Sequence, residues 1–185
     1  VFPFMRYITS DSTLPPRHRA ILILRTAWLA QSANLWATHA SRAGEAGLPA
    51  DEVLRVAEGA GEDWSEFETV LIKLADELFQ NASVTDETWE ALTQEYDLYN
   101  MVDAVVTVNE TTAHAVLFNS LGIQPDDNTT AQIPTDDVAY RVNAPDREPP
   151  LTVPRIEPLQ GDGLRVGRTF RRHPDMAEAR GTNPG

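Results

Sequence analysis

Residues 14–30, LPPRHRAILILRTAWLA, decide the fold of this chain. Thr13 is a good N-cap for a helix, and Pro15 and Pro16 suit a first helical turn, where N–H groups have no partner within the helix. The large apolar residues that follow recur at helical spacing, and they are Ile21, Leu22, Leu24, Trp28 and Leu29. We therefore expect a helix with an apolar face over this segment.

The next segments carry helix signals of the same kind. Residues 34–48, NLWATHASRAGEAGL, predict a second helix that ends at Gly44 and Gly47. These glycines allow either a helix stop or a close contact between helices. A short helix is expected from Ala50 to Glu58, where Gly59 follows.

Three more helices are expected before residue 124. Asp63 and Glu66 make a start like a capping box for residues 64–80, WSEFETVLIKLADELFQ. Thr85 caps a short helix, with acidic residues in its first turn that suit the helix dipole. The last long helix runs from Asp97 to Leu121 and stops at Gly122. The sequence therefore predicts an all-α domain over residues 1–123.

The character of the chain changes after this domain. Residues 124–153 are rich in Pro, Asp, Asn and Thr and show no helical period, which predicts a linker. Residues 154–185 form a C-terminal arm with basic residues and spaced apolar residues. Such an arm gains stability only against another surface, so we expect it to pack on a helical core across a subunit or domain boundary. The protein is then an oligomer.

Composition excludes several classes of function. The 185 residues include no cysteine, which removes disulfides, thiolate nucleophiles and cysteine-bound metals. The formal net charge of −13 argues against nucleic acid as a partner, because binding it needs a basic surface. No apolar run approaches the length that spans a membrane. We expect a cytoplasmic protein without membrane contact.

Several segments, in order, carry a family resemblance. They are residues 14–30 and 34–59, the Asp76-Glu77-Leu78 helix, VTDETWEAL at 84–92 and a final helix ending NSLGI. The first 125 residues resemble the carboxymuconolactone decarboxylase and alkylhydroperoxidase D-like superfamily. The resemblance implies an all-α bundle that assembles into oligomers, with active sites near subunit interfaces. The arm resembles the lead-in of a second such domain, so the chain resembles a piece of a tandem protein or a circular permutation.

The resemblance also places the residues of the family's site. Peroxidases of this superfamily carry a Cys-x-x-Cys pair before a histidine, and those positions are Ser32, Leu35 and His39 here. The position of their upstream glutamate is Ala20, and the Tyr-Glu-Trp triplet of cysteine-free relatives is Asn34-Leu35-Trp36. Thiol peroxidation needs thiols, so this chain is not a thiol peroxidase. His39 remains a candidate for acid/base catalysis.

The last long helix offers partners for His39. Asp103, Thr107, Glu110 and His114 are spaced to form one polar stripe on an otherwise apolar helix. Glu110 and His114 are one turn apart and could form a hydrogen bond that raises the pKa of the histidine. The stripe faces either water or a pocket, and the pair is alternatively solvated or part of an interface.

Further residues are candidates for substrate binding: Arg25, Trp36, Ser32 and Thr107. Arg25 either grips a substrate carboxylate or is an ion-pair partner, and Trp36 is either a substrate contact or core. Ser32 lacks the partners of a hydrolase triad. The histidines show no metal-binding spacing, and no phosphate-binding loop is present. We therefore expect neither a metal nor a cofactor.

Resemblance to the decarboxylase branch implies a function for this domain. It is a cofactor-free lyase, decarboxylase or isomerase acting on a small carboxylated or carbonyl-bearing molecule. His39 moves the proton, with help from Glu110 or His114. The alternative is a non-catalytic scaffold domain in a tandem or oligomeric assembly, because Ala20 and Leu35 replace acids. A polar pocket at His39 favours the enzyme, and a pocket filled by apolar side chains favours the scaffold.

Overall fold

The computed structural model describes residues 12–125, and this part of the chain is all-helical, which confirms the all-α fold class there. The expected linker (124–153), apart from its first two residues, and the expected arm (154–185) lie outside the described residues. The elements in chain order are α2 (Pro16–Leu29), α3 (Ala33–Ala40), the 3-10 helix η2 (Ala43–Ala46), α4 (Ala50–Glu58), α5 (Glu66–Asn81), α6 (Asp86–Leu92) and α7 (Leu98–Leu121).

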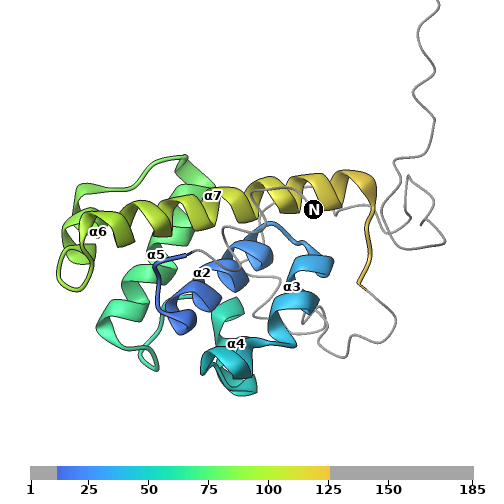
Figure 1. Ribbon diagram of the computed structural model, residues 1–185, viewed down its shortest axis with the longest axis horizontal. Coiled ribbons are helices and arrows are strands. Elements are labelled where there is room, and N and C mark those ends of the chain that lie inside the picture. Colours follow the sequence, from blue (N-terminus) through green and yellow to red (C-terminus); the bar gives the residue numbers. More distant parts are fainter. Residues whose placement is uncertain (1–11, 126–185) are drawn as a thin grey trace, which may run out of the picture.

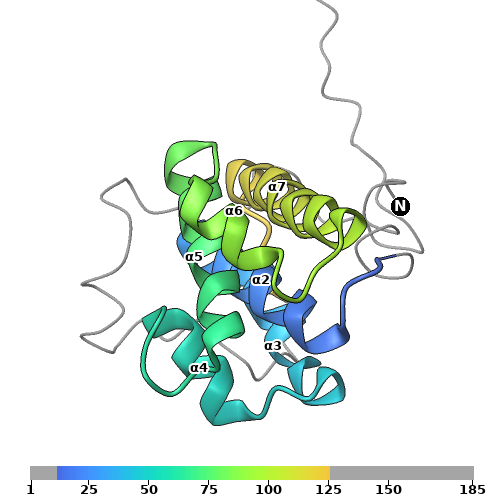
Figure 2. The ribbon, with the colours of Figure 1, turned by 90° about the vertical axis from the view of Figure 1, so that its left-hand side faces the viewer.

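Helix α2 forms the centre of the bundle (Figures 1 and 2). It packs against α3, α4, α5 and α7, and every residue from Ile21 to Leu29 is buried. A helix with neighbours on all sides must be apolar on nearly all sides, which explains why residues 20–24 read AILIL. The expectation of a single apolar face was therefore too narrow.

Helix α7 is the longest element and lies along one side of the bundle (Figure 1). Asp97 caps its first turn by accepting a hydrogen bond from the N–H of Asn100, and Gly122 ends it in the left-handed conformation. Both boundaries were predicted from the sequence. The predicted helix from Ala50 to Glu58 and the Thr85 cap of α6 are also confirmed. Within the described residues, no helix is both long and apolar enough to cross a membrane.

Two predicted helix starts were wrong by two residues. Helix α2 begins at Pro16 without a side-chain cap, and Thr13 instead donates to Asp103 of α7 through its N–H and its hydroxyl. Helix α5 is capped by Ser65 and Glu68, which form a full capping box, rather than by Asp63 with Glu66. At α2 a tertiary contact to Asp103 takes the expected cap away from the helix, whereas at α5 a second local pair of polar residues forms the capping box.

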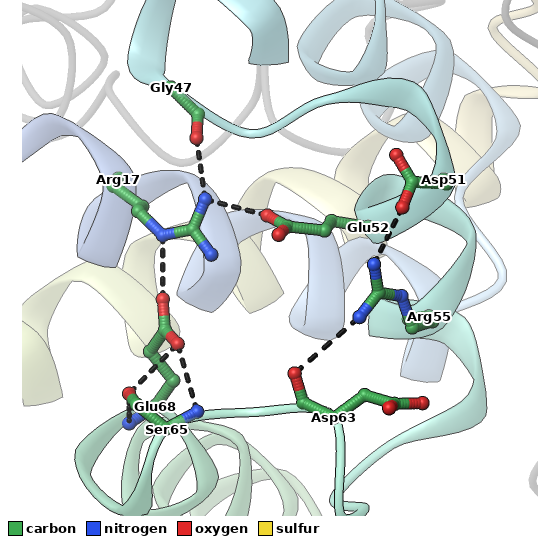
Figure 3. Close-up of polar contacts among 8 residues, drawn as sticks. All are labelled: Arg17, Gly47, Asp51, Glu52, Arg55, Asp63, Ser65 and Glu68. Carbon is green, nitrogen blue, oxygen red and sulfur yellow. Dashed lines mark hydrogen bonds and ion pairs between the residues drawn. The ribbon is translucent and has the colours of Figure 1, made fainter.

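Arg17 joins three helices at the start of α2 (Figure 3). Its guanidinium lies 2.6 Å from Glu52 of α4 and 2.6 Å from Glu68 of α5, and it also donates to the carbonyl of Gly47. Burial lowers the pKa of Arg17, but the hydrogen bonds to the two carboxylates outweigh burial and raise it. Burial raises the pKa of Glu68, and the hydrogen bonds from Arg17 and Ser65 more than reverse that effect.

The next residue along the chain, His18, faces a different neighbour. Its Nδ1 lies 2.8 Å from the hydroxyl of Tyr96, and its ring contacts Phe67 of α5. Burial lowers the pKa of His18 and raises that of Tyr96. The rings of His18, Phe67 and Tyr96 therefore pack together where α2, α5 and the segment before α7 meet.

Candidate functional site

A pocket with a volume of about 300 Å³ opens beside His39, and we call it the His39 pocket. It lies between the start of α2, the end of α3 and the 3-10 helix η2. Its lining residues are Pro16, Arg19, Ala20, Ile23, His39, Arg42, Ala43, Glu45 and Ala46. The wall of the pocket is therefore partly apolar and partly charged. The pocket itself is not filled by large apolar side chains.

Helical spacing explains how α2 forms one wall. Arg19, Ala20 and Ile23 occupy neighbouring positions on one side of the helix, one turn after it begins. Ala20 stands where the family resemblance would place a glutamate. Ala43 and Ala46 are equally small, so the three alanines leave the space that forms the pocket.

Helix α3 carries His39 in its last turn, and Arg42 follows one turn later. The imidazole is only partly exposed, at the wall of the pocket. Burial is the main cause that lowers the pKa of His39, from 6.5 to about 4. The positive charges of Arg42, Arg19 and His114 lower it further. His39 is therefore neutral at neutral pH, so it can accept a proton there.

The two arginines of the pocket differ from the other arginines of the described residues. Arg17, Arg25 and Arg55 each form an ion pair with a carboxylate. Within residues 12–125, no hydrogen bond or ion pair engages the side chain of Arg19 or Arg42. Two unpaired guanidinium groups thus line one small cavity, in a chain whose overall charge is strongly negative.

The predicted stripe on α7 faces the interior of the bundle, not this pocket. Asp103, Thr107 and His114 are buried, and Glu110 is partly exposed. Asp103 binds the segment before α2, and the hydroxyl of Thr107 lies 3.4 Å from Asp103. Of the four, only His114 acts on the pocket, because its charge contributes to the low pKa of His39.

The predicted hydrogen bond between Glu110 and His114 is absent among the described residues. The closest described ring to His114 is that of Phe118, with the ring centroids 6.3 Å apart. Neither Glu110 nor Thr107 lines the His39 pocket. The two residues therefore have no direct route to a ligand in it.

Arg25 is an ion-pair partner, which is one of the two roles that the sequence left open. Its guanidinium meets Asp76 through two nitrogens, at 2.6 and 3.2 Å, and donates to the carbonyls of Val56 and Ala57 at 3.1 and 2.8 Å. It is buried and does not line the pocket. Arg25 therefore connects α2, α4 and α5 rather than gripping a ligand.

The other two candidates are also in the core. Trp36 is buried beside Trp28, with ring centroids 6.0 Å apart. Ser32 is fully buried, and its hydroxyl has no hydrogen-bond partner among the described residues. Neither residue lines the His39 pocket.

The sequence interpretation missed Arg19, Arg42 and Glu45 as residues of the site. A usable signal was present, because Arg42 follows His39 by three residues, which is one helical turn. Arg19 also directly precedes Ala20, a position that the resemblance had already marked. What the sequence could not show is that neither arginine has a carboxylate partner within residues 12–125.

Within residues 12–125, no group of three or more His, Asp or Glu side chains is arranged to hold a metal ion. The chain was also compared with known proteins. No protein-family model matches it, and no curated protein matches it.

Proposed function

We propose that this domain is an enzyme that moves a proton on a small carboxylated carbonyl compound, with His39 as the acid/base group. The observation that carries the proposal is a cavity of about 300 Å³ in which a neutral imidazole lies with two arginines that have no ion-pair partner among the described residues. Family resemblance to carboxymuconolactone decarboxylases supports the same reaction classes, which are lyase, decarboxylase and isomerase.

Each polar residue has a role in this proposal. Arg19 and Arg42 bind the carboxylate, because guanidinium groups match its geometry with paired hydrogen bonds. The neutral His39 takes a proton from the carbon beside the carbonyl, and the electrons of that C–H bond form an enolate. The arginines stabilise the enolate oxygen. Where the substrate carries a C=C bond next to that carbon, the enolate is a dienolate. The imidazolium then returns the proton to the far end of the dienolate, the double bond moves, and the isomerisation is complete.

In a decarboxylation, His39 would act as the proton donor instead of the proton acceptor. The bond to the departing carboxylate breaks, carbon dioxide leaves, and its bonding electrons form the enolate. The enolate then takes a proton from the imidazolium of His39. Both reactions balance without a redox partner, and neither needs a thiol, which this cysteine-free chain lacks.

One observation favours the alternative, a non-catalytic scaffold domain. Within residues 12–125, no side chain forms a hydrogen bond with the imidazole of His39, so nothing among them sets its tautomer. The unfilled, charged wall of the pocket weighs against that alternative, because a scaffold needs no such cavity. We therefore favour the enzyme.

Proton transfer can be tested before the product is known. The protein is incubated in deuterium oxide with a panel of small 2-oxo and 3-oxo acids, and NMR follows loss of C–H signals and release of carbon dioxide. We expect deuterium incorporation or carbon dioxide with the wild-type protein, loss of both with His39→Gln, and no change with Arg55→Gln. Arg55 is the control because it pairs with Asp51, outside the pocket. A wild-type protein that is inactive on the whole panel would overturn the proposal.

A further inference from the structure

The His39 pocket holds two kinds of group whose charges oppose each other. The imidazole must gain a positive charge to act as a proton donor, and two guanidinium groups in the same wall resist that charge. In the absence of a ligand the conflict is resolved by leaving His39 neutral. The decarboxylation described above, however, needs a proton donor at this position.

An anion in the pocket removes the conflict. A carboxylate between Arg19 and Arg42 would cancel part of their positive charge, and it would also place a negative charge beside His39. Both effects favour the imidazolium. We propose that a small carboxylate bound between Arg19 and Arg42 causes His39 to take up a proton, so that the ligand itself creates the acid. This inference rests on the proposed function for its choice of ligand.

The other charged groups around His39 are consistent with this coupling between carboxylate binding and protonation of His39. Glu45 of η2 lines the same pocket and supplies the nearest negative charge in its wall. The charge of His114 in α7 also lowers the pKa of His39. Among the described residues, the charged groups that lower the pKa of His39 are Arg42, Arg19 and His114, whereas Glu45 is known only as a residue of the pocket wall. Only the two arginines would be compensated directly by a bound carboxylate.

The arrangement also gives a reason why Arg19 and Arg42 have no ion-pair partner in the described part of the chain. Glu45 is the acidic residue that lines the pocket, and within residues 12–125 it forms no ion pair with Arg19 or Arg42. A carboxylate paired with either arginine would cancel its charge permanently and would reduce the difference between the empty and the occupied state. Ala20, which follows Arg19 in α2 and lines the same pocket, carries no charge. The charge that balances Arg19 and Arg42 is therefore left for the ligand to bring.

Calorimetry measures this coupling without requiring turnover. Oxalate is titrated into the full chain at a pH of about 6, in two buffers with different ionisation enthalpies. Oxalate is fully ionised there, so protons taken up on binding go to the protein. A carboxylate beside an imidazole raises its pKa by about one to three units. If the pKa of His39 rises from about 4 by two units, binding takes up about half a proton per oxalate.

Three variants separate the parts of the inference. Arg42→Gln should weaken oxalate binding by about tenfold or more, because it removes a charge-assisted contact. His39→Gln should still bind oxalate but with heats that no longer depend on the buffer. Arg55→Gln should behave as the wild type.

The outcomes also distinguish this inference from the proposed function. Oxalate binding with buffer-independent heats in the wild type would overturn the coupling, while the anion site and the deuterium-exchange test would stand. No oxalate binding, or equal losses in Arg42→Gln and Arg55→Gln, would overturn the anion site itself. Deuterium exchange on carbonyl compounds would then decide the proposed function independently.

Discussion

The low pKa of His39 makes a quantitative prediction about stability and pH. In the unfolded chain the imidazole has its ordinary pKa of 6.5, and in the folded protein the pKa is about 4. As the pH falls below 6.5, the unfolded state therefore binds a proton that the folded state does not. A difference of 2.5 units corresponds to at most about 3 kcal/mol, because each unit is worth about 1.4 kcal/mol. The penalty is absent above pH 6.5 and complete below about pH 4.

The substitution His39→Gln isolates this effect, because glutamine is polar but does not titrate. We expect the variant to gain stability relative to the wild type as the pH falls from about 7 to about 4, by at most about 3 kcal/mol. Urea unfolding followed by circular dichroism at a series of pH values measures both proteins. Protonation of carboxylates with lowered pKa, such as Glu68 and Glu77, also destabilises the protein in acid. This loss of stability is the same in both proteins, so it cancels in the difference between them.

A difference between the two proteins that does not change with pH would refute the reasoning. It would mean that the imidazole of His39 is hydrated and far enough from Arg19 and Arg42 to keep its ordinary pKa. An NMR titration of the His39 ring in the folded protein gives an independent measurement. Protonation near pH 6.5 without any ligand would contradict both the burial and the charge argument.

Three further substitutions test other parts of the structure by urea unfolding. Arg25→Gln should cost about 3–5 kcal/mol, because it breaks a buried pair and leaves two carbonyls unpaired, whereas Arg55→Gln on the exposed surface should change little. Gly59→Ala should cost about 1–3 kcal/mol, because φ is +98° and a Cβ atom would lie 3.1 Å from the guanidinium of Arg25; an unchanged midpoint would exclude this strain. Ser32→Ala should be neutral or stabilising by up to about 1 kcal/mol, since its buried hydroxyl has no partner among the described residues, and a clear loss of stability would contradict that description.

The helix boundaries that the sequence predicted well are those set by local chemistry. Asp97 and Gly122 bracket α7 because a cap and a left-handed glycine act within one turn of the helix. The start of α2 was less predictable. Thr13 is a good cap by itself, but it binds Asp103, which is 90 residues away in the sequence.

In the candidate site, too, features set by local sequence were predictable and features set by contacts between distant segments were not. His39 was found because its position in α3 is local information that a family resemblance can carry. The arginines were not found, because pairing depends on which helices meet. Arg17 and Arg19 are two residues apart in one helix, yet one is held by two carboxylates and the other by none among the described residues. The sequence alone does not contain that distinction in any short segment.

The first turn of α2 also constrains how this protein can change during evolution. Arg17, His18 and Arg19 are consecutive, and each points to a different neighbour because successive residues on a helix are rotated by about 100°. One faces the carboxylates of α4 and α5, the next faces Tyr96, and the third faces the pocket. Inserting or deleting one residue between Arg19 and Ile21 would rotate all three away from these partners at once. Substitutions at the alanines of the pocket wall would change the shape of the pocket without moving these three residues, whereas a change in the length of this segment would move them.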